Sequence, residues 1–160
     1  MFTKEKLKII IDENNAIIIG TGAGLSSAAG FEYGGKTFFN NFKYLFEKYG
    51  YQDMHSAGFH NFSSPEEKWG FWAKMICLNR YNDSGKDFYK RLYALVQWNN
   101  YFVITTNVDH QFQKNGFDKE RLFYIQGNYE LFQCSRAYHN KTYDNKNYIE
   151  EMVKMKFLNI

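Results

Sequence analysis

The chain has 160 residues and a formal net charge of +3; 44% of its residues are hydrophobic and 20% aromatic. This length and apolar content are typical of one globular domain with a sizeable core, and they exclude a disordered chain. The basic residues are scattered, which disfavours nucleic-acid binding, and no apolar run approaches the ~20 residues of a membrane span. Cys77 and Cys134 cannot build a disulfide framework, and the N-terminus does not resemble a signal peptide, so a cytoplasmic location is expected.

In chain order the sequence predicts an α/β fold with a parallel sheet. An amphipathic helix at residues 3–14 leads to a buried strand at 16–20, and a glycine turn leads from that strand into a helix at 25–30. The aromatic, glycine-rich residues 31–64 are expected to hold one short helix, and a segment of this length is typical of a lid. The remaining elements are helices from Pro65 to about Ile76, at 86–98 and at 148–157, and strands at 101–106, 122–125 and 129–133.

The glycine turn after the first strand is the most informative feature. A strand that runs through glycines into a helix holds a nucleotide phosphate in many α/β proteins, because glycine lets the backbone approach the anion. The turn does not fit the G-x-G-x-x-G dinucleotide fingerprint: Leu25 or Ser27 stands at the last position. Residues 30–37 match the P-loop pattern, but a P-loop follows a strand directly, and residues 25–29 favour a helix. A P-loop nucleotide hydrolase is therefore a minor alternative.

Two further segments end strands with polar residues. The strand at 101–106 is followed by Asn107 and Asp109, and the strand at 122–125 by Gln126 and Gly127. Because ligands bind at the carboxyl ends of parallel strands, these segments and the glycine turn are expected to face one ligand. Asn107 could orient a ribose or a water, although an Asx turn alone would also explain this segment.

Together the three segments resemble the sirtuin family. They stand in family order as Gly22-Ala23-Gly24-Leu25-Ser26, Thr105-Thr106-Asn107-Val108-Asp109 and Gln126-Gly127. The run from Thr105 through Ser135 is most similar to the macrodomain-linked bacterial branch, class M. The resemblance implies a Rossmann-like parallel sheet with helices on both faces, a long lid or helical insertion at about 31–64, and NAD as co-substrate. The implied cofactor-binding residues are Gly22, Ala23, Gly24, Ser26, Tyr33, Asn107, Asp109 and Gln126, and the implied catalytic residues are Asn107, Asp109 and Gln126.

Gln126 stands where most sirtuins have the histidine that acts as general base in deacylation. Glutamine cannot take a proton near neutral pH. The resemblance therefore implies cleavage of the nicotinamide–ribose bond and transfer of ADP-ribose to a protein, with a lipoyl-carrier protein as the expected acceptor. The alternatives are a non-catalytic NAD-binding remnant and an NAD-dependent protein deacylase.

The resemblance also implies a structural zinc held by four cysteines in two pairs. Cys134 matches the first ligand position, Tyr138 stands at its partner position with His139 alongside, and no second cysteine pair follows. Residues 129–145 are thus expected to be an incomplete zinc-module remnant. Because sirtuin domains are longer, residues 1–160 are expected to form a single NAD-binding domain truncated at its C-terminus, which a second fragment could complete.

Overall fold

The computed structural model describes residues 3–81 and 87–155. The chain divides into two compact units. The first unit comprises Met1–Ala29 and Gly85–Asn128, and the second comprises Gly30–Ser84 and Tyr129–Ile160. Each unit is described by itself.

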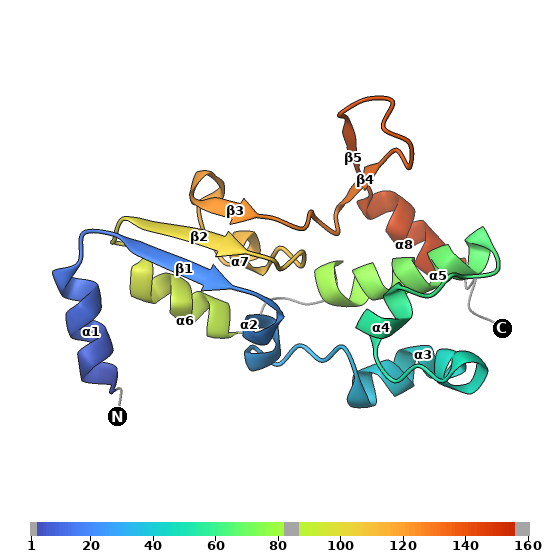
Figure 1. The fold of residues 1–160 in the computed structure, drawn as a ribbon, viewed down its shortest axis with the longest axis horizontal. Coiled ribbons are helices and arrows are strands. Elements are labelled where there is room, and N and C mark those ends of the chain that lie inside the picture. The colour runs from blue at the N-terminus through green and yellow to red at the C-terminus, as the bar shows by residue number, and fades with distance from the viewer. Residues whose placement is uncertain (1–2, 82–86, 156–160) are drawn as a thin grey trace. The chain divides into compact units, whose positions relative to one another are not determined.

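The first unit contains a parallel sheet of three strands in the order β1-β2-β3 (Figure 1). Ile17 pairs with Tyr101 and Thr21 with Thr105, and Thr105 pairs in turn with Tyr124, so the three strands end at the same edge. Its elements are α1 (Lys4–Glu13), β1 (Ile17–Thr21), α2 (Ala23–Ala28), α6 (Asp87–Val96), β2 (Tyr101–Thr105), α7 (Gln111–Lys114), the short 3-10 helix η2 (Lys119–Arg121) and β3 (Leu122–Tyr124). The predicted parallel sheet and the strand–turn–helix at residues 16–30 are confirmed.

Aromatic side chains form the core of this unit. Tyr89 of α6 lies edge-on to Phe112 of α7, with ring centroids 5.2 Å apart, and Phe112 contacts Phe117 at 4.9 Å. Phe117 in turn meets Tyr101 of β2 at 5.6 Å, so this core covers one face of the sheet. On the alternate positions of β1 and β2, Ile18 is 73% exposed and Phe102 is 40% exposed. Within the described residues, the side chains at these positions of β1 and β2 are therefore less covered than those that face the aromatic core.

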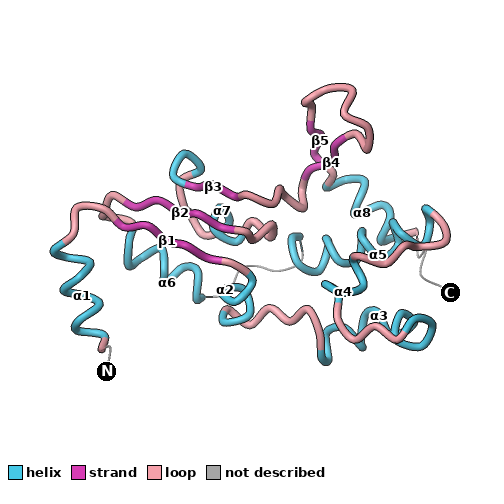
Figure 2. The backbone as a smooth tube through the Cα atoms, viewed as in Figure 1, coloured by secondary structure: helices cyan, strands magenta, loops and turns pink. Residues whose placement is uncertain are grey.

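The second unit is built from helices and one antiparallel hairpin (Figure 2). Its elements are α3 (Gly35–Tyr49), α4 (Met54–Gly58), α5 (Pro65–Ile76), the π-helix η1 (Cys77–Tyr81), β4 (Leu131–Gln133), β5 (Thr142–Asp144) and α8 (Lys146–Lys154). The prediction of one short helix in residues 31–64 is wrong, because α3 and α4 both form there. The strand predicted at 129–133 forms as β4 and pairs antiparallel with β5. Among residues 3–81 and 87–155, no helix is long and apolar enough to cross a membrane.

Residues 30–37 do not have the context of a P-loop. The segment before them is helix α2, and Gly34 caps the start of α3 with its backbone in an extended conformation. A P-loop carries the chain from a strand into a helix, so that the phosphate lies at the end of a sheet. Residues 30–37 therefore match the P-loop pattern in sequence only.

The core of the second unit is the contact between α3 and α5. Phe38, Phe42 and Leu45 recur at helical spacing on α3 and are fully buried, and the ring of Phe42 lies 5.2 Å from that of Phe71 on α5. Helix α5 begins as predicted, with Pro65 in its first turn and the Ser64 hydroxyl accepting from the backbone N–H of Glu67. Cys77, directly after α5, is buried.

Glu67 is a buried carboxylate that joins three segments of the second unit. Its side chain is 3% exposed and accepts hydrogen bonds from Lys48 Nζ at 2.9 Å, Tyr49 Oη at 2.8 Å and Ser63 Oγ at 2.9 Å. Burial by itself raises the pKa of Glu67, but the hydrogen bonds from these donors outweigh it and hold the pKa below its usual value of 4.5. The ionised carboxylate therefore stabilises the folded unit.

Glu67→Ala is expected to destabilise the second unit by roughly 2–3 kcal/mol, because three donors lose a charged acceptor. A carboxyl whose folded-state pKa is lowered stabilises the fold above its unfolded pKa and loses that contribution as pH falls through the folded pKa. The difference in unfolding free energy between wild type and variant should therefore be full near pH 7 and shrink below about pH 4.5. Urea unfolding at several pH values measures it, and a difference that does not change with pH would contradict the role of the charge.

Candidate functional site

The glycine turn and the ends of β2 and β3 meet at one edge of the first unit's sheet. The backbone N–H of Thr106 donates to the Thr21 carbonyl at 3.1 Å, and that of Ile125 donates to the Thr105 carbonyl at 3.0 Å. Both bonds continue the pairing of the sheet just beyond the strands. The three loops that follow are thus held next to one another, as expected from the sequence.

Ser26 is the centre of a buried hydrogen-bond network at this edge. Its hydroxyl donates to Asp109 Oδ2 at 2.6 Å. A serine hydroxyl has a single proton, so its two other close partners must donate to it: Asn107 Nδ2 at 3.0 Å and Tyr89 Oη at 3.1 Å. Ser26 and Asp109 are 1% and 2% exposed. The network fastens α2 to the loop after β2, across more than 80 residues of sequence.

Asp109 and Asn107 are each held by a second hydrogen bond. The other carboxylate oxygen of Asp109, Oδ1, accepts from the backbone N–H of Gln111 at 3.2 Å. The backbone N–H of Asn107 donates to Thr105 Oγ1 at 3.0 Å. Their side chains are therefore fixed in direction, as a binding or catalytic group needs to be.

Tyr89 is a member of this network that the sequence did not indicate. Its side chain is fully buried, and burial, reinforced by the negative charge of Asp109, raises the pKa of Tyr89 to about 12. The hydroxyl therefore keeps its proton at physiological pH and donates it to Ser26. In the sequence Tyr89 looks like any other apolar position of a helix.

Tyr89→Phe is expected to lower the unfolding free energy by about 1 kcal/mol, because it removes one buried hydrogen bond and keeps the ring. Tyr93→Phe is the matched control, since Tyr93 lies on the same helix and packs by its ring against Phe117 at 5.0 Å. Denaturant unfolding of both variants measures the difference. Equal effects would show that the bond to Ser26 adds nothing to stability.

The two glycines of the turn have different structural roles. A Cβ added to Gly22 would stand 3.0 Å from Thr106 Oγ1, so the close packing of the loop after β2 excludes a side chain there. A Cβ added to Gly24 would meet nothing within 4 Å. Packing of this unit does not require glycine at position 24, and the open backbone of Gly24 and the exposed Ala23 is compatible with a phosphate approaching α2.

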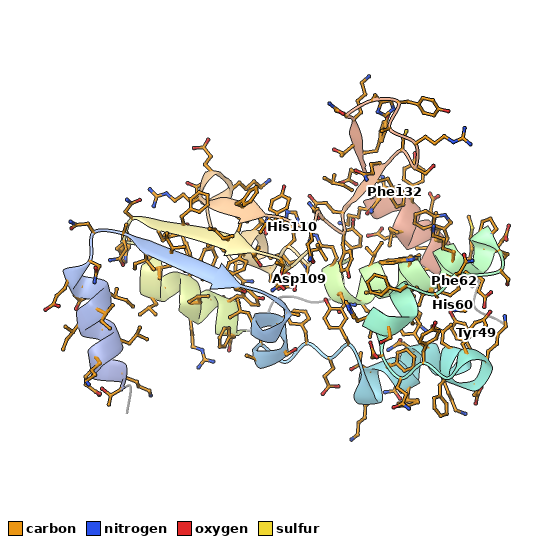
Figure 3. The ribbon with its side chains drawn as sticks, in the orientation of Figure 1. Tyr49, His60, Phe62, Asp109, His110 and Phe132 are labelled. Atoms are coloured by element: carbon orange, nitrogen blue, oxygen red, sulfur yellow. The ribbon has the colours of Figure 1, made fainter. Side chains whose placement is uncertain are left out.

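The cleft beside the network is small, about 10 Å³, and is lined from the ends of both β2 and β3. Its walls include Asn107, Asp109, His110, Tyr124 and Gly127. Gln126, the exposed residue before Gly127, lies in the loop that forms one side of this cleft. Figure 3 shows Asp109 and His110 together, directly after β2.

Two predicted site residues belong to the second unit. Tyr33 packs partly buried against the aromatic core there. Cys134 lies exposed at the end of β4, with its sulfur 3.4 Å from His139 Nε2. Neither belongs to the network around Ser26.

Zinc does not fit the residues around Cys134. A closed structural zinc site needs four ligands. The hairpin brings Cys134 to His139, but within residues 3–81 and 87–155 no three His, Cys, Asp or Glu side chains are grouped as a metal site requires.

The chain is similar in sequence to ADP-ribosyltransferases. It is 42% identical over 149 residues to a protein ADP-ribosyltransferase of Staphylococcus aureus, which covers 93% of this chain and 47% of that protein. It is 33% identical over 127 residues to a probable bifunctional ADP-ribose hydrolase/ADP-ribosyltransferase of Fusarium oxysporum, covering 75% of this chain and 20% of that protein. The chain thus spans about half the length of the first of these relatives and less of the second. No protein-family model matches the chain.

Solved Sir2 structures share the fold. A Sir2 homologue in complex with NAD superposes with a TM-score of 0.58 at 19% identity, over 89% of this chain and 52% of that one. A second solved structure, described as the structural basis of sirtuin substrate affinity, superposes with a TM-score of 0.59 at 25% identity. The superposition covers 95% of this chain and 57% of that one. The chain has a sirtuin-like, Rossmann-like α/β fold, and the predicted fold class is confirmed.

Proposed function

We propose that this chain acts in NAD-dependent protein ADP-ribosylation of the sirtuin type. We further propose that it belongs to the macrodomain-linked bacterial branch of that family and works in the cytoplasm. The observation that carries the proposal is the network in which Ser26 joins the glycine turn to Asn107 and Asp109. It holds a phosphate-compatible turn and two oriented polar groups at the carboxyl edge of a parallel sheet, where ligands bind in such folds. The similarity to a protein ADP-ribosyltransferase supports the same activity.

The residues at this edge would share the work in NAD cleavage. Backbone groups near Gly24 would take the pyrophosphate, and Asp109 keeps Ser26 and the start of α7 in place. Asn107 would orient the nicotinamide ribose for attack at its C1′ atom. Gln126 would hydrogen-bond a ribose hydroxyl without taking its proton. Nicotinamide leaves with the electron pair of the broken bond, and a protein nucleophile receives the ADP-ribose. A lipoyl-carrier protein is the proposed acceptor.

Ligand-dependent thermal stability tests the binding part of this proposal. A ligand that binds only the folded state stabilises it by about 2.7 kcal/mol at 100 times its Kd. NAD and ADP-ribose are expected to raise the melting temperature, whereas ATP with Mg²⁺ is not, because residues 30–37 lack the strand that a P-loop requires. A shift with ATP alone would refute the assignment to NAD.

Nicotinamide release separates the enzyme from a module that only binds NAD. An enzyme is expected to cleave NAD and to transfer its ADP-ribose. A module that only binds NAD is expected to show a melting shift without nicotinamide release. Labelling of a purified lipoyl-carrier protein with ³²P-NAD then tests the proposed acceptor.

The wild-type chain is expected to show negligible NAD-dependent deacetylation, because Gln126 cannot act as a general base. Gln126→His is expected to bind NAD about as well as wild type, since both side chains have similar reach. Release of acetyl groups from an acetyl-lysine peptide measures the activity, and melting shifts measure binding. Robust deacetylation by the wild type would show that Gln126 does not determine the reaction.

A further inference from the structure

His110 has a backbone conformation that L-residues rarely adopt. Its φ is 62° and ψ is 19°, and within the described residues it is the one non-glycine residue with positive φ. The left-handed region costs a residue with a Cβ about 1 kcal/mol or more, and such strain is found preferentially at functional sites. Here it falls directly after Asp109, where the chain turns from β2 into α7 (Figure 3).

The imidazole of His110 is held in one orientation at the cleft. Its Nδ1 lies 2.8 Å from Asn128 Oδ1, and its ring centroid lies 6.0 Å from that of Tyr124. In the tautomer in which Nδ1–H donates to this amide oxygen, the neutral ring has its lone pair on Nε2. Nε2 is then the atom that can act as a base.

The proposed reaction needs a proton acceptor beside the ribose. When the bond from C1′ to nicotinamide breaks, the attacking nucleophile forms a new bond to C1′ and loses a proton. The amides of Asn107 and Gln126 cannot take that proton. Both carboxylate oxygens of Asp109 already accept hydrogen bonds, from Ser26 and from the Gln111 backbone. His110 is the imidazole that lines the same cleft.

We propose that His110 is a catalytic residue whose Nε2 takes the proton of the nucleophile that attacks C1′, a step that rests on the proposed NAD cleavage. With water as nucleophile, the oxygen bonds to C1′, its proton passes to Nε2, and nicotinamide leaves with the electron pair of the glycosidic bond. With a protein acceptor, the hydroxyl, amine or thiol of that acceptor takes the place of water. The base of this cleft would thus be His110, on the loop after β2. Gln126, on the loop after β3, cannot act as a base.

Nicotinamide release from NAD in water tests this role without knowledge of the protein acceptor. His110→Asn and His110→Gly suit the left-handed backbone and remove the base. Both are expected to keep the melting shift with NAD and to release nicotinamide about 100-fold more slowly or worse. Added imidazole should restore part of the rate in His110→Gly, where it has space to bind. His55→Asn, an exposed position on α4, is the matched control and should behave as wild type.

The outcomes distinguish the role of His110 from the proposed NAD cleavage on which it rests. A wild type that neither binds nor cleaves NAD overturns the proposed function and the role of His110 with it. An active wild type together with a fully active His110→Asn overturns the role of His110 alone. Loss of NAD binding in both variants also overturns it, because the residue would then serve binding. Nitrogen NMR of the labelled chain should find the His110 proton on Nδ1, and a proton on Nε2 in the neutral ring would refute the base.

Discussion

Gly24→Val is expected to weaken NAD binding about 100-fold or more while the first unit stays folded. A Cβ at position 24 meets nothing within 4 Å, and Gly24 lies within helix α2, in a conformation that valine can adopt. Glycine is also a poor helix former, so the substitution should not lower the stability of the unliganded chain. The new side chain would instead occupy the open space over the turn, where a phosphate must come close to the backbone.

Melting temperatures with and without NAD measure this effect. At an NAD concentration of 100 times the wild-type Kd, wild type gains about 2.7 kcal/mol, whereas a variant that binds 100-fold more weakly gains only about 0.4 kcal/mol. Gly20→Val is the matched control, because a Cβ at position 20 of β1 also meets nothing within 4 Å. It should keep the full shift. Equal NAD affinity in wild type and Gly24→Val would show that the turn is not the cofactor site.

The parts of the fold with strong local patterns were predictable from sequence. Three β-branched residues before a glycine turn fix β1 and the start of α2, and Pro65 after Ser64 fixes the start of α5. The polar residues after β2 could be placed near the turn because parallel strands end at the same edge. The hydrogen bonds among Ser26, Asn107 and Asp109 bear out that placement, while their roles in catalysis stay predictions.

The rest depends on contacts between distant residues, which leave no local pattern. Tyr89 forms a hydrogen bond with Ser26, which lies 63 residues away in the sequence. Nothing in the sequence around Tyr89 indicates that its hydroxyl has a hydrogen-bond partner. The strand at 131–133 finds its partner at 142–144 only through the hairpin, so its sequence alone could not assign it to an antiparallel sheet. The strain at His110 is likewise invisible in the sequence, because it is imposed by the turn between β2 and α7.

Asn107→Ala is expected to lower the rate of nicotinamide release about 100-fold or more, with NAD affinity changed far less. Asn107 is half-buried at the end of β2, and bonds to Thr105 and Ser26 fix its backbone and its amide. A polar group fixed before the reaction stabilises the transition state without reorganisation, and its loss therefore lowers kcat and kcat/KM together. Nicotinamide release under saturating and limiting NAD measures both, and the melting shift reports binding.

Ser26→Ala distinguishes whether Asn107 acts on the substrate or only through Ser26. Asn107 Nδ2 donates to Ser26 Oγ at 3.0 Å. If Asn107 acts only by holding Ser26, its side chain should have no further effect on the rate once that oxygen is removed. In that case Ser26→Ala, Asn107→Ala and the double variant would share one rate. If Asn107 orients the ribose itself, adding Asn107→Ala to Ser26→Ala should lower the rate further, beyond what either change does alone. Asn140→Ala, exposed in the second unit, controls for the loss of an amide. An Asn107→Ala chain that releases nicotinamide at the wild-type rate would remove Asn107 from the reaction.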